Sequence, residues 1–142
     1  MEKNAITELE QLTVNNRSKN FLRETAKWTK FLSILGFIGL GLLFIGSFFV
    51  GNLYKDLPQA QGLPFDIGVF MTIYCIVIIL IYFFPIYYLF QFSTKMKKAL
   101  QTKDDDTLSD AFEVLKSHYK FMGVFTIIIL SLYVMLIVVG LL

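Results

Sequence analysis

The sequence predicts an all-α integral membrane protein with three transmembrane helices, the second and third extended into a cytoplasmic helical hairpin, and a short amphipathic N-terminal helix. Three observations lead to this prediction. Residues 31–50, 67–92 and 121–142 form long apolar blocks without a charged residue. Hydrophobic residues make up 56% of the 142 residues, whereas soluble domains contain about 45–50%. Lys and Arg residues gather on one side of the blocks.

The composition excludes several function classes. The chain is long enough for one domain, and its mean hydropathy is +0.63. A net charge of +2 arises from 13 basic and 11 acidic residues, so no basic field indicates a nucleic-acid partner. The single cysteine, Cys75, excludes an internal disulfide and a cysteine-rich metal site.

Residues 1–30 are predicted to form a cytoplasmic amphipathic segment. Apolar residues recur at helical spacing from Ile6 to Leu12 and again from Phe21 to Trp28. A break at Asn15 and Asn16 predicts two short helices, the second lying on the membrane surface. A partner-binding arm is the alternative. The segment lacks the apolar core of a cleavable signal peptide, so the first span is expected to remain as a signal anchor.

The first span, residues 31–50, has the ~20 apolar residues needed to cross a hydrocarbon core of ~30 Å. Gly36, Gly39 and Gly46 fall on one face, where glycine allows close approach of another helix. We expect an independent, glycine-faced anchor within its own bundle. Homo-oligomer formation through this face is the alternative.

The outer loop, residues 51–66, contains Pro58, Gly62 and Pro64 and is too short for an external domain. Asp66 is expected to cap the second span, residues 67–92. Pro85 predicts a kink near the inner end of that span. This span is the most polar of the three. Its polar side chains are Thr72, Tyr74, Tyr82, Tyr87, Tyr88 and Gln91. They are expected either to line a pore or to hydrogen-bond within the bundle.

Residues 93–120 are predicted to form the cytoplasmic hairpin, with a turn near Asp104 and a capping box from Thr107 to Asp110. Apolar residues continue at helical spacing beyond both spans. The residues expected at a partner contact or at the packing seam of the hairpin are Met96, Leu100, Leu108, Phe112, Leu115 and Tyr119.

Heptad-like spacing predicts the register of this hairpin. Leu100 is expected to meet Leu108, and Met96 to meet Phe112. Extrapolated into the third span, residues 121–142, the same register pairs Tyr82 with Thr126 and Cys75 with Tyr133.

The orientation follows from the Lys and Arg residues, which favour the cytoplasmic side. Twelve of the thirteen lie in residues 1–30 and 93–120, and the outer loop holds only Lys55. The sequence therefore predicts a cytoplasmic N-terminus and a C-terminus outside.

No catalytic, cofactor or metal site is predicted. The three blocks contain no Asp, Glu, Lys, Arg or His residue that would indicate a transport path. His118 is the only histidine, and Asp104, Asp105 and Asp106 lack the alternation of a calcium loop. We interpret His118 as structural and the acidic run as a solvated turn.

Three segments resemble a family of small three-span membrane proteins of unknown function from Bacteroidota. They are residues 21–37 (FLRETAKWTKFLSILGF), 82–100 (YFFPIYYLFQFSTKMKKAL) and 108–123 (LSDAFEVLKSHYKFMG). The resemblance implies a cell-envelope location in the inner membrane and no activity. With the orientation predicted from the Lys and Arg residues, the C-terminus is then expected in the periplasm.

The leading hypothesis is a structural or accessory subunit that displays the hairpin to a cytoplasmic or membrane-protein partner. The alternative is a homo-oligomeric channel or small transporter, since three spans cannot enclose a conduit alone. An enzyme is not expected.

Overall fold

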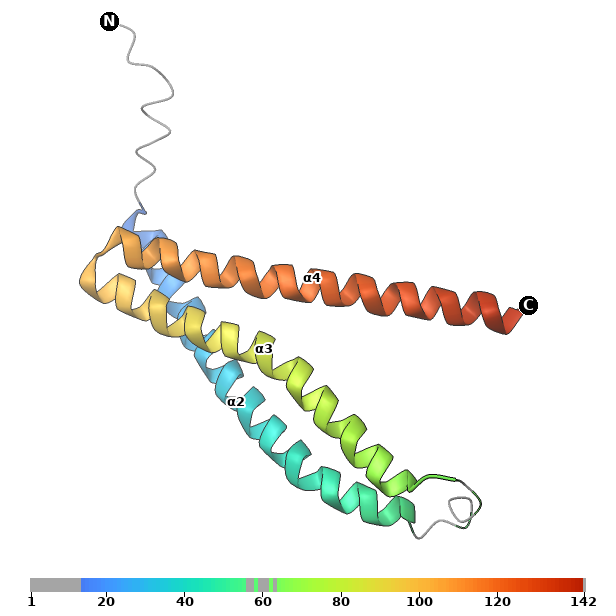
Figure 1. Ribbon diagram of the computed structural model, residues 1–142. Helices are drawn as coiled ribbons and strands as arrows, with labels where there is room; N and C mark the ends of the chain where they lie inside the picture. The colour runs from blue at the N-terminus through green and yellow to red at the C-terminus, as the bar shows by residue number, and fades with distance from the viewer. Residues whose placement is uncertain (1–13, 56–57, 59–61, 63, 142) are drawn as a thin grey trace, which may run out of the picture.

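The computed structural model describes residues 14–55, 58, 62 and 64–141, and the elements formed by these residues are three long helices. They are α2 (Asn16–Lys55), α3 (Ile67–Thr102) and α4 (Asp105–Leu141) (Figure 1). Each helix is long and apolar enough to cross a membrane. The all-helical architecture with three candidate spans is therefore confirmed.

The first described helix begins earlier than the first predicted span. The Asn15 side chain accepts a hydrogen bond from the Ser18 backbone N–H at 2.8 Å and so caps the helix. No proline or glycine interrupts residues 16–30, and α2 continues without a break into the apolar block. The prediction of a separate surface helix in this stretch is wrong; the predicted helix from Ile6 to Leu12 lies outside the described residues.

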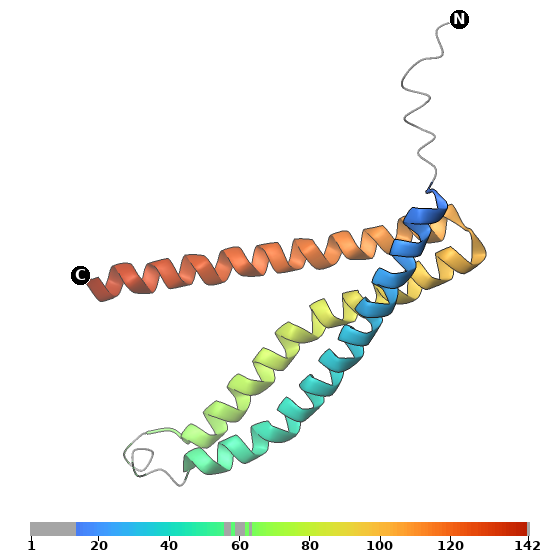
Figure 2. The same ribbon diagram turned by 180° about the vertical axis from the view of Figure 1, so that it is seen from behind.

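Helices α2 and α3 lie side by side along their length and run in opposite directions (Figures 1 and 2). Their contact uses small residues on α2: Ala26, Ser33 and Ser47 are buried, as is Leu40, and the four recur every seventh residue. A seven-residue repeat keeps one face of a helix against its partner. The first span is therefore packed on the second, as expected of a helix within its own bundle, whereas the prediction that it is independent of the other spans is wrong.

The three predicted glycines do not share one contact. A Cβ atom added at Gly36 would lie 3.0 Å from the Ile86 side chain, whereas one added at Gly39 or Gly46 would meet nothing within 4 Å. Gly51, which was not singled out, packs more closely: its added Cβ would collide with Thr72 Oγ1 and lie 3.0 Å from the Gly68 carbonyl oxygen. Of the glycine face expected on this helix, Gly36 lies at the contact with α3, whereas Gly39 and Gly46 do not.

The connection between α3 and α4 is a turn of two residues. Lys103 adopts the left-handed conformation at φ 55°, ψ 38° and ends α3. Asp104 then caps α4 by accepting from the backbone N–H groups of Asp106 and Thr107, each at 3.3 Å. The Thr107 hydroxyl also donates to the Asp104 carboxylate. The turn lies where the register pairing placed it, but the capping box from Thr107 to Asp110 is wrong because the cap lies three residues earlier.

Helix α4 packs on α3 near this turn and then leaves it (Figures 1 and 2). The last aromatic contacts join Phe84 to Phe121, with ring centroids 6.0 Å apart, and Tyr82 to Phe125 at 6.5 Å. From residue 126 to residue 141 every side chain is exposed. The extrapolated pairing of Cys75 with Tyr133 is therefore wrong, because this half of α3 packs on α2 instead.

Candidate functional site

The start of α2, the end of α3 and the start of α4 converge at one end of the molecule (Figure 1). Four buried residues form the centre of this convergence: Ala26 of α2, Phe92 and Met96 of α3, and Ala111 of α4. Partly buried apolar side chains surround them, namely Leu22, Leu100, Leu108, Val114 and Leu115. These nine residues are called the three-helix cluster below. Met96 is fully buried at 0% exposure.

The structure brings together four of the six residues predicted for the hairpin seam. Met96, Leu100, Leu108 and Leu115 belong to the three-helix cluster. Phe112 and Tyr119 do not, and their side chains are 45% and 66% exposed. The inward position on α4 is Ala111 rather than Phe112, because the small methyl side chain lets the two helices approach closely. The prediction placed the large side chain of Phe112 against α3, whereas the observed contact is made by the small side chain of Ala111.

Sequence reasoning missed the contribution of α2. Leu22 and Ala26 complete the three-helix cluster, yet Phe21 and Trp28 dominate the apolar pattern of this segment and are both mostly exposed. The signal that could have found Ala26 is its seven-residue spacing from Ser33, which continues to Leu40 and Ser47.

His118 bridges α4 to α3 at the point where the two helices begin to separate. Its Nδ1 atom lies 3.0 Å from the Pro85 carbonyl oxygen. A carbonyl oxygen can only accept, so Nδ1 carries the proton and donates this hydrogen bond. The structural interpretation of the lone histidine fits this contact.

Three of the polar side chains predicted on α3 form hydrogen bonds within the chain. The Thr72 hydroxyl donates to the Gly68 carbonyl oxygen at 2.9 Å and lies 3.4 Å from the Ser47 carbonyl oxygen of α2. The Gln91 amide donates to the Tyr87 hydroxyl at 2.8 Å. Within the described part of the chain, no buried side-chain nitrogen or oxygen lacks a partner. Thr72 therefore serves the contact with α2, whereas the bond between Gln91 and Tyr87 lies within α3. Tyr74 and Tyr82 are 56% and 49% exposed, so for them both roles that the sequence left open stay predictions.

Comparison of the chain with protein-family models, curated proteins and solved structures finds no match. The resemblance to the Bacteroidota family stays a prediction, since none of these comparisons tests it.

The charged residues near the turn serve local structure. Among the residues that the structure describes, no three His, Cys, Asp or Glu side chains lie close enough to hold a metal ion. Lys95 of α3 reaches Asp110 of α4 at 3.5 Å, an exposed pair that adds little stability. The hydrogen bond from the Thr107 hydroxyl is the main cause that lowers the pKa of Asp104, which favours the ionised cap.

The part of α4 that packs on neither of the other described helices is therefore the candidate site. It comprises the exposed side chains of Phe112 and Tyr119 in the first half of α4 and the exposed residues 126–141 in its second half. This surface is called the free face of α4 below. It offers shape and apolar contact rather than chemistry.

Proposed function

We propose that this chain is a non-enzymatic structural or accessory subunit of the inner (cytoplasmic) membrane that presents the α3–α4 hairpin and the free face of α4 to a membrane-protein partner. The observation that carries the proposal is the separation of α4 from the other two helices (Figures 1 and 2). Its most apolar 18-residue window contains no buried residue, against 6% in that of α3 and 17% in that of α2, and α2 and α3 lie side by side along most of their length. A membrane helix that is anchored at one end and free along the rest is suited to associate with another protein.

The proposed orientation places the hairpin in the cytoplasm and the C-terminus in the periplasm. Lys and Arg residues are concentrated in the first half of α2, the end of α3 and the start of α4, which converge at one end (Figure 1). This charge distribution supports a cytoplasmic location for the converging end.

Site-specific photocrosslinking in cells tests the partner. A crosslinking amino acid replaces Phe112 or Leu132 on the free face, and a control replaces Ile38, which is exposed on α2. We expect one and the same second protein at Phe112 and Leu132 and none at Ile38. Adducts with lipid alone at all three positions would overturn the proposal.

A second arm of the experiment uses polar variants. The double variant Phe112→Ser, Tyr119→Ser removes the two exposed aromatic side chains from the first half of α4 and changes no residue of the three-helix cluster. We expect the second protein to be lost from the purified complex. The matched control, Phe48→Ser, changes an equally exposed residue of α2.

The alternative, a homo-oligomeric channel or small transporter, would produce adducts between copies of this chain only. Such a pore needs a free polar face, whereas the Thr72 hydroxyl donates within its own helix and lies against the Ser47 carbonyl oxygen of α2. This pairing favours the accessory role.

A further inference from the structure

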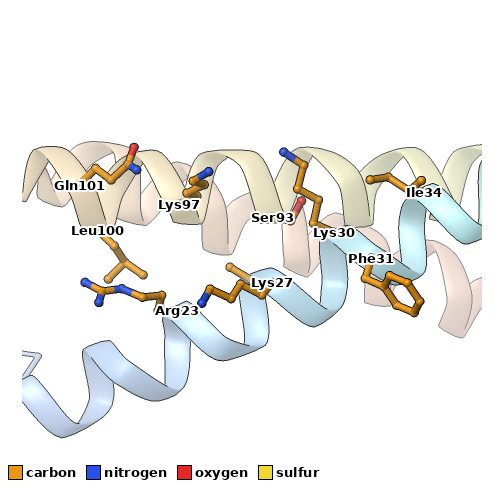
Figure 3. Close-up of a pocket in the computed structure, with 10 residues that line it drawn as sticks. Arg23, Lys27, Lys30, Phe31, Ile34, Ser93, Lys97, Leu100 and Gln101 are labelled. Carbon is orange, nitrogen blue, oxygen red and sulfur yellow. The ribbon is translucent and has the colours of Figure 1, made fainter.

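A groove between α2 and α3 near the converging end is lined by four cationic side chains. Arg23, Lys27 and Lys30 project from α2, and Lys97 projects from α3 (Figure 3). The groove has a volume of about 470 Å³, and no carboxylate lines it. Ligand pockets commonly have volumes of ~300–1,000 Å³.

These four charges form no ion pair within the described part of the chain, although Glu24 lines a hollow beside Arg23 and Lys27. None of them has a carboxylate oxygen within 4.0 Å among the residues that the structure describes, where the recorded ion pair joins Lys95 to Asp110. Four neighbouring cations repel one another, and an anion placed between them would relieve that repulsion. The groove therefore favours an occupant that carries negative charge.

The rest of the lining is apolar and continues toward the uncharged block. Phe31 and Ile34 line the groove directly beyond Lys30, and Ala26 and Leu100 line it from either helix. Residues 31–50 contain no charge, so the four cations lie at the boundary where the apolar block begins. Phospholipid headgroups occupy this level of a bilayer, and their acyl chains extend from it along apolar side chains.

We propose that this groove binds one anionic phospholipid, with its phosphate group held by Arg23, Lys27, Lys30 and Lys97 and an acyl chain lying along Phe31 and Ile34. A free phosphate would use the cations but leave the apolar part of the groove uncovered. A neutral lipid would cover the apolar part but bring no net negative charge. This inference does not depend on the accessory role, because the groove lies between α2 and α3, away from the free face of α4.

Trp28 offers a direct readout. It is the only tryptophan, and it lines an adjoining hollow of about 640 Å³ together with Asn20, Arg23, Glu24, Lys27 and Phe31. The purified full-length protein is reconstituted in bilayers that mix phosphatidylcholine with phosphatidylglycerol, in which one lipid carries brominated acyl chains that quench tryptophan fluorescence at short range. The quenching is measured once with brominated phosphatidylglycerol and once with brominated phosphatidylcholine. The ratio of the two gives the relative binding constant of the two lipids at the site beside Trp28.

The decisive variant is Lys97→Gln, because Lys97 lies on the helix opposite Trp28. Its matched control is Lys98→Gln, which removes the same charge from an exposed neighbour that does not line the groove.

At near-physiological salt, a Debye length of about 8 Å suppresses the general attraction of anionic lipid to the surface. We expect the unchanged protein to favour phosphatidylglycerol by more than about ten-fold, since four cations of roughly 1 kcal/mol each line the groove. Lys97→Gln should lower this preference about five-fold, since each cation contributes roughly 1 kcal/mol, and Lys98→Gln should lower it less than about two-fold at this screening length.

Three results would overturn the proposal. The unchanged protein showing no preference would exclude an anionic site, and equal losses in the two variants would indicate a general surface attraction. Loss of the preference on adding excess inorganic phosphate would show that a soluble anion occupies the groove.

Discussion

The two halves of α4 differ although they belong to one continuous helix. The first half packs Ala111 and Leu115 into the three-helix cluster and joins α3 through His118. The second half, residues 126–141, has only exposed side chains. Both halves are apolar on at least one face, so apolar character alone does not explain which half packs.

The difference shows what a contact between membrane helices requires. Lipid chains cover an apolar helix as well as another helix does, so close contact depends on small residues and matching shape. The α2–α3 contact has Ala26, Ser33, Ser47 and Gly51 in its face. In residues 126–141 large aliphatic side chains prevail, and the few small residues form no seven-residue series.

The largest expected effect separates the two halves directly. Met96→Ala should lower the free energy of unfolding by about 2–5 kcal/mol, because it leaves a cavity in the three-helix cluster. Met135→Ala changes the same residue type on the free half, where the side chain is 63% exposed, and should cost less than about 0.5 kcal/mol. Reversible unfolding in mixed micelles measures both. Equal losses would mean that the second half of α4 is packed.

The next effect tests the α2–α3 contact. Gly51→Ala should destabilise by about 1–3 kcal/mol through overpacking, since the new Cβ meets Thr72 and the Gly68 carbonyl oxygen. Gly46→Ala is the control: its Cβ meets nothing within 4 Å, so it should be neutral or stabilise by up to about 1 kcal/mol through helix propensity. The same unfolding measurement applies, and a larger loss for Gly46→Ala would contradict the assigned contact face.

A smaller effect is expected at the point of separation. His118→Leu removes the hydrogen bond to the Pro85 carbonyl oxygen and should cost about 0.5–1.5 kcal/mol. Ser117→Ala is the neighbouring control, because the Ser117 hydroxyl only donates to Glu113 within its own helix. Spin labels on α3 and α4 should also report a wider spread of separations in the His118 variant; an unchanged distribution in that variant would show that the bond does not hold the helices together.

The smallest effect concerns the turn. The Thr107 hydroxyl lowers the pKa of Asp104, so the cap contributes stability above the ordinary carboxyl pKa and loses it as the pH falls through the lowered value. Thr107→Val should move the pKa of Asp104 upward and shift this loss to higher pH. A carboxyl titration by NMR measures it, with Thr102→Val as control, since Thr102 bonds only to Lys98 of its own helix. An unmoved pKa in Thr107→Val would exclude the assigned cause.

The positions of the helices could be predicted from sequence because each depends on local chemistry. Uncharged stretches of sufficient length define the spans, Asp66 caps α3 as expected, and the acidic run beyond Lys103 marks the turn. The choice of partner for each helix could not be predicted in the same way. Within an apolar span every face is compatible with lipid, so the pattern does not distinguish a face that meets a helix from one that does not.

By itself, the sequence determined the three apolar spans, the position of the turn near Asp104 and the gathering of basic residues in two segments. The tertiary structure alone decided that α2 rather than α4 covers the apolar half of α3, and that Ala111 rather than Phe112 faces Met96. It also decided that Lys97 joins Arg23, Lys27 and Lys30 around one groove, although these residues lie far apart in the chain. Hydropathy and capping act between neighbours along the chain, whereas packing depends on the shapes of surfaces that only the folded chain brings together.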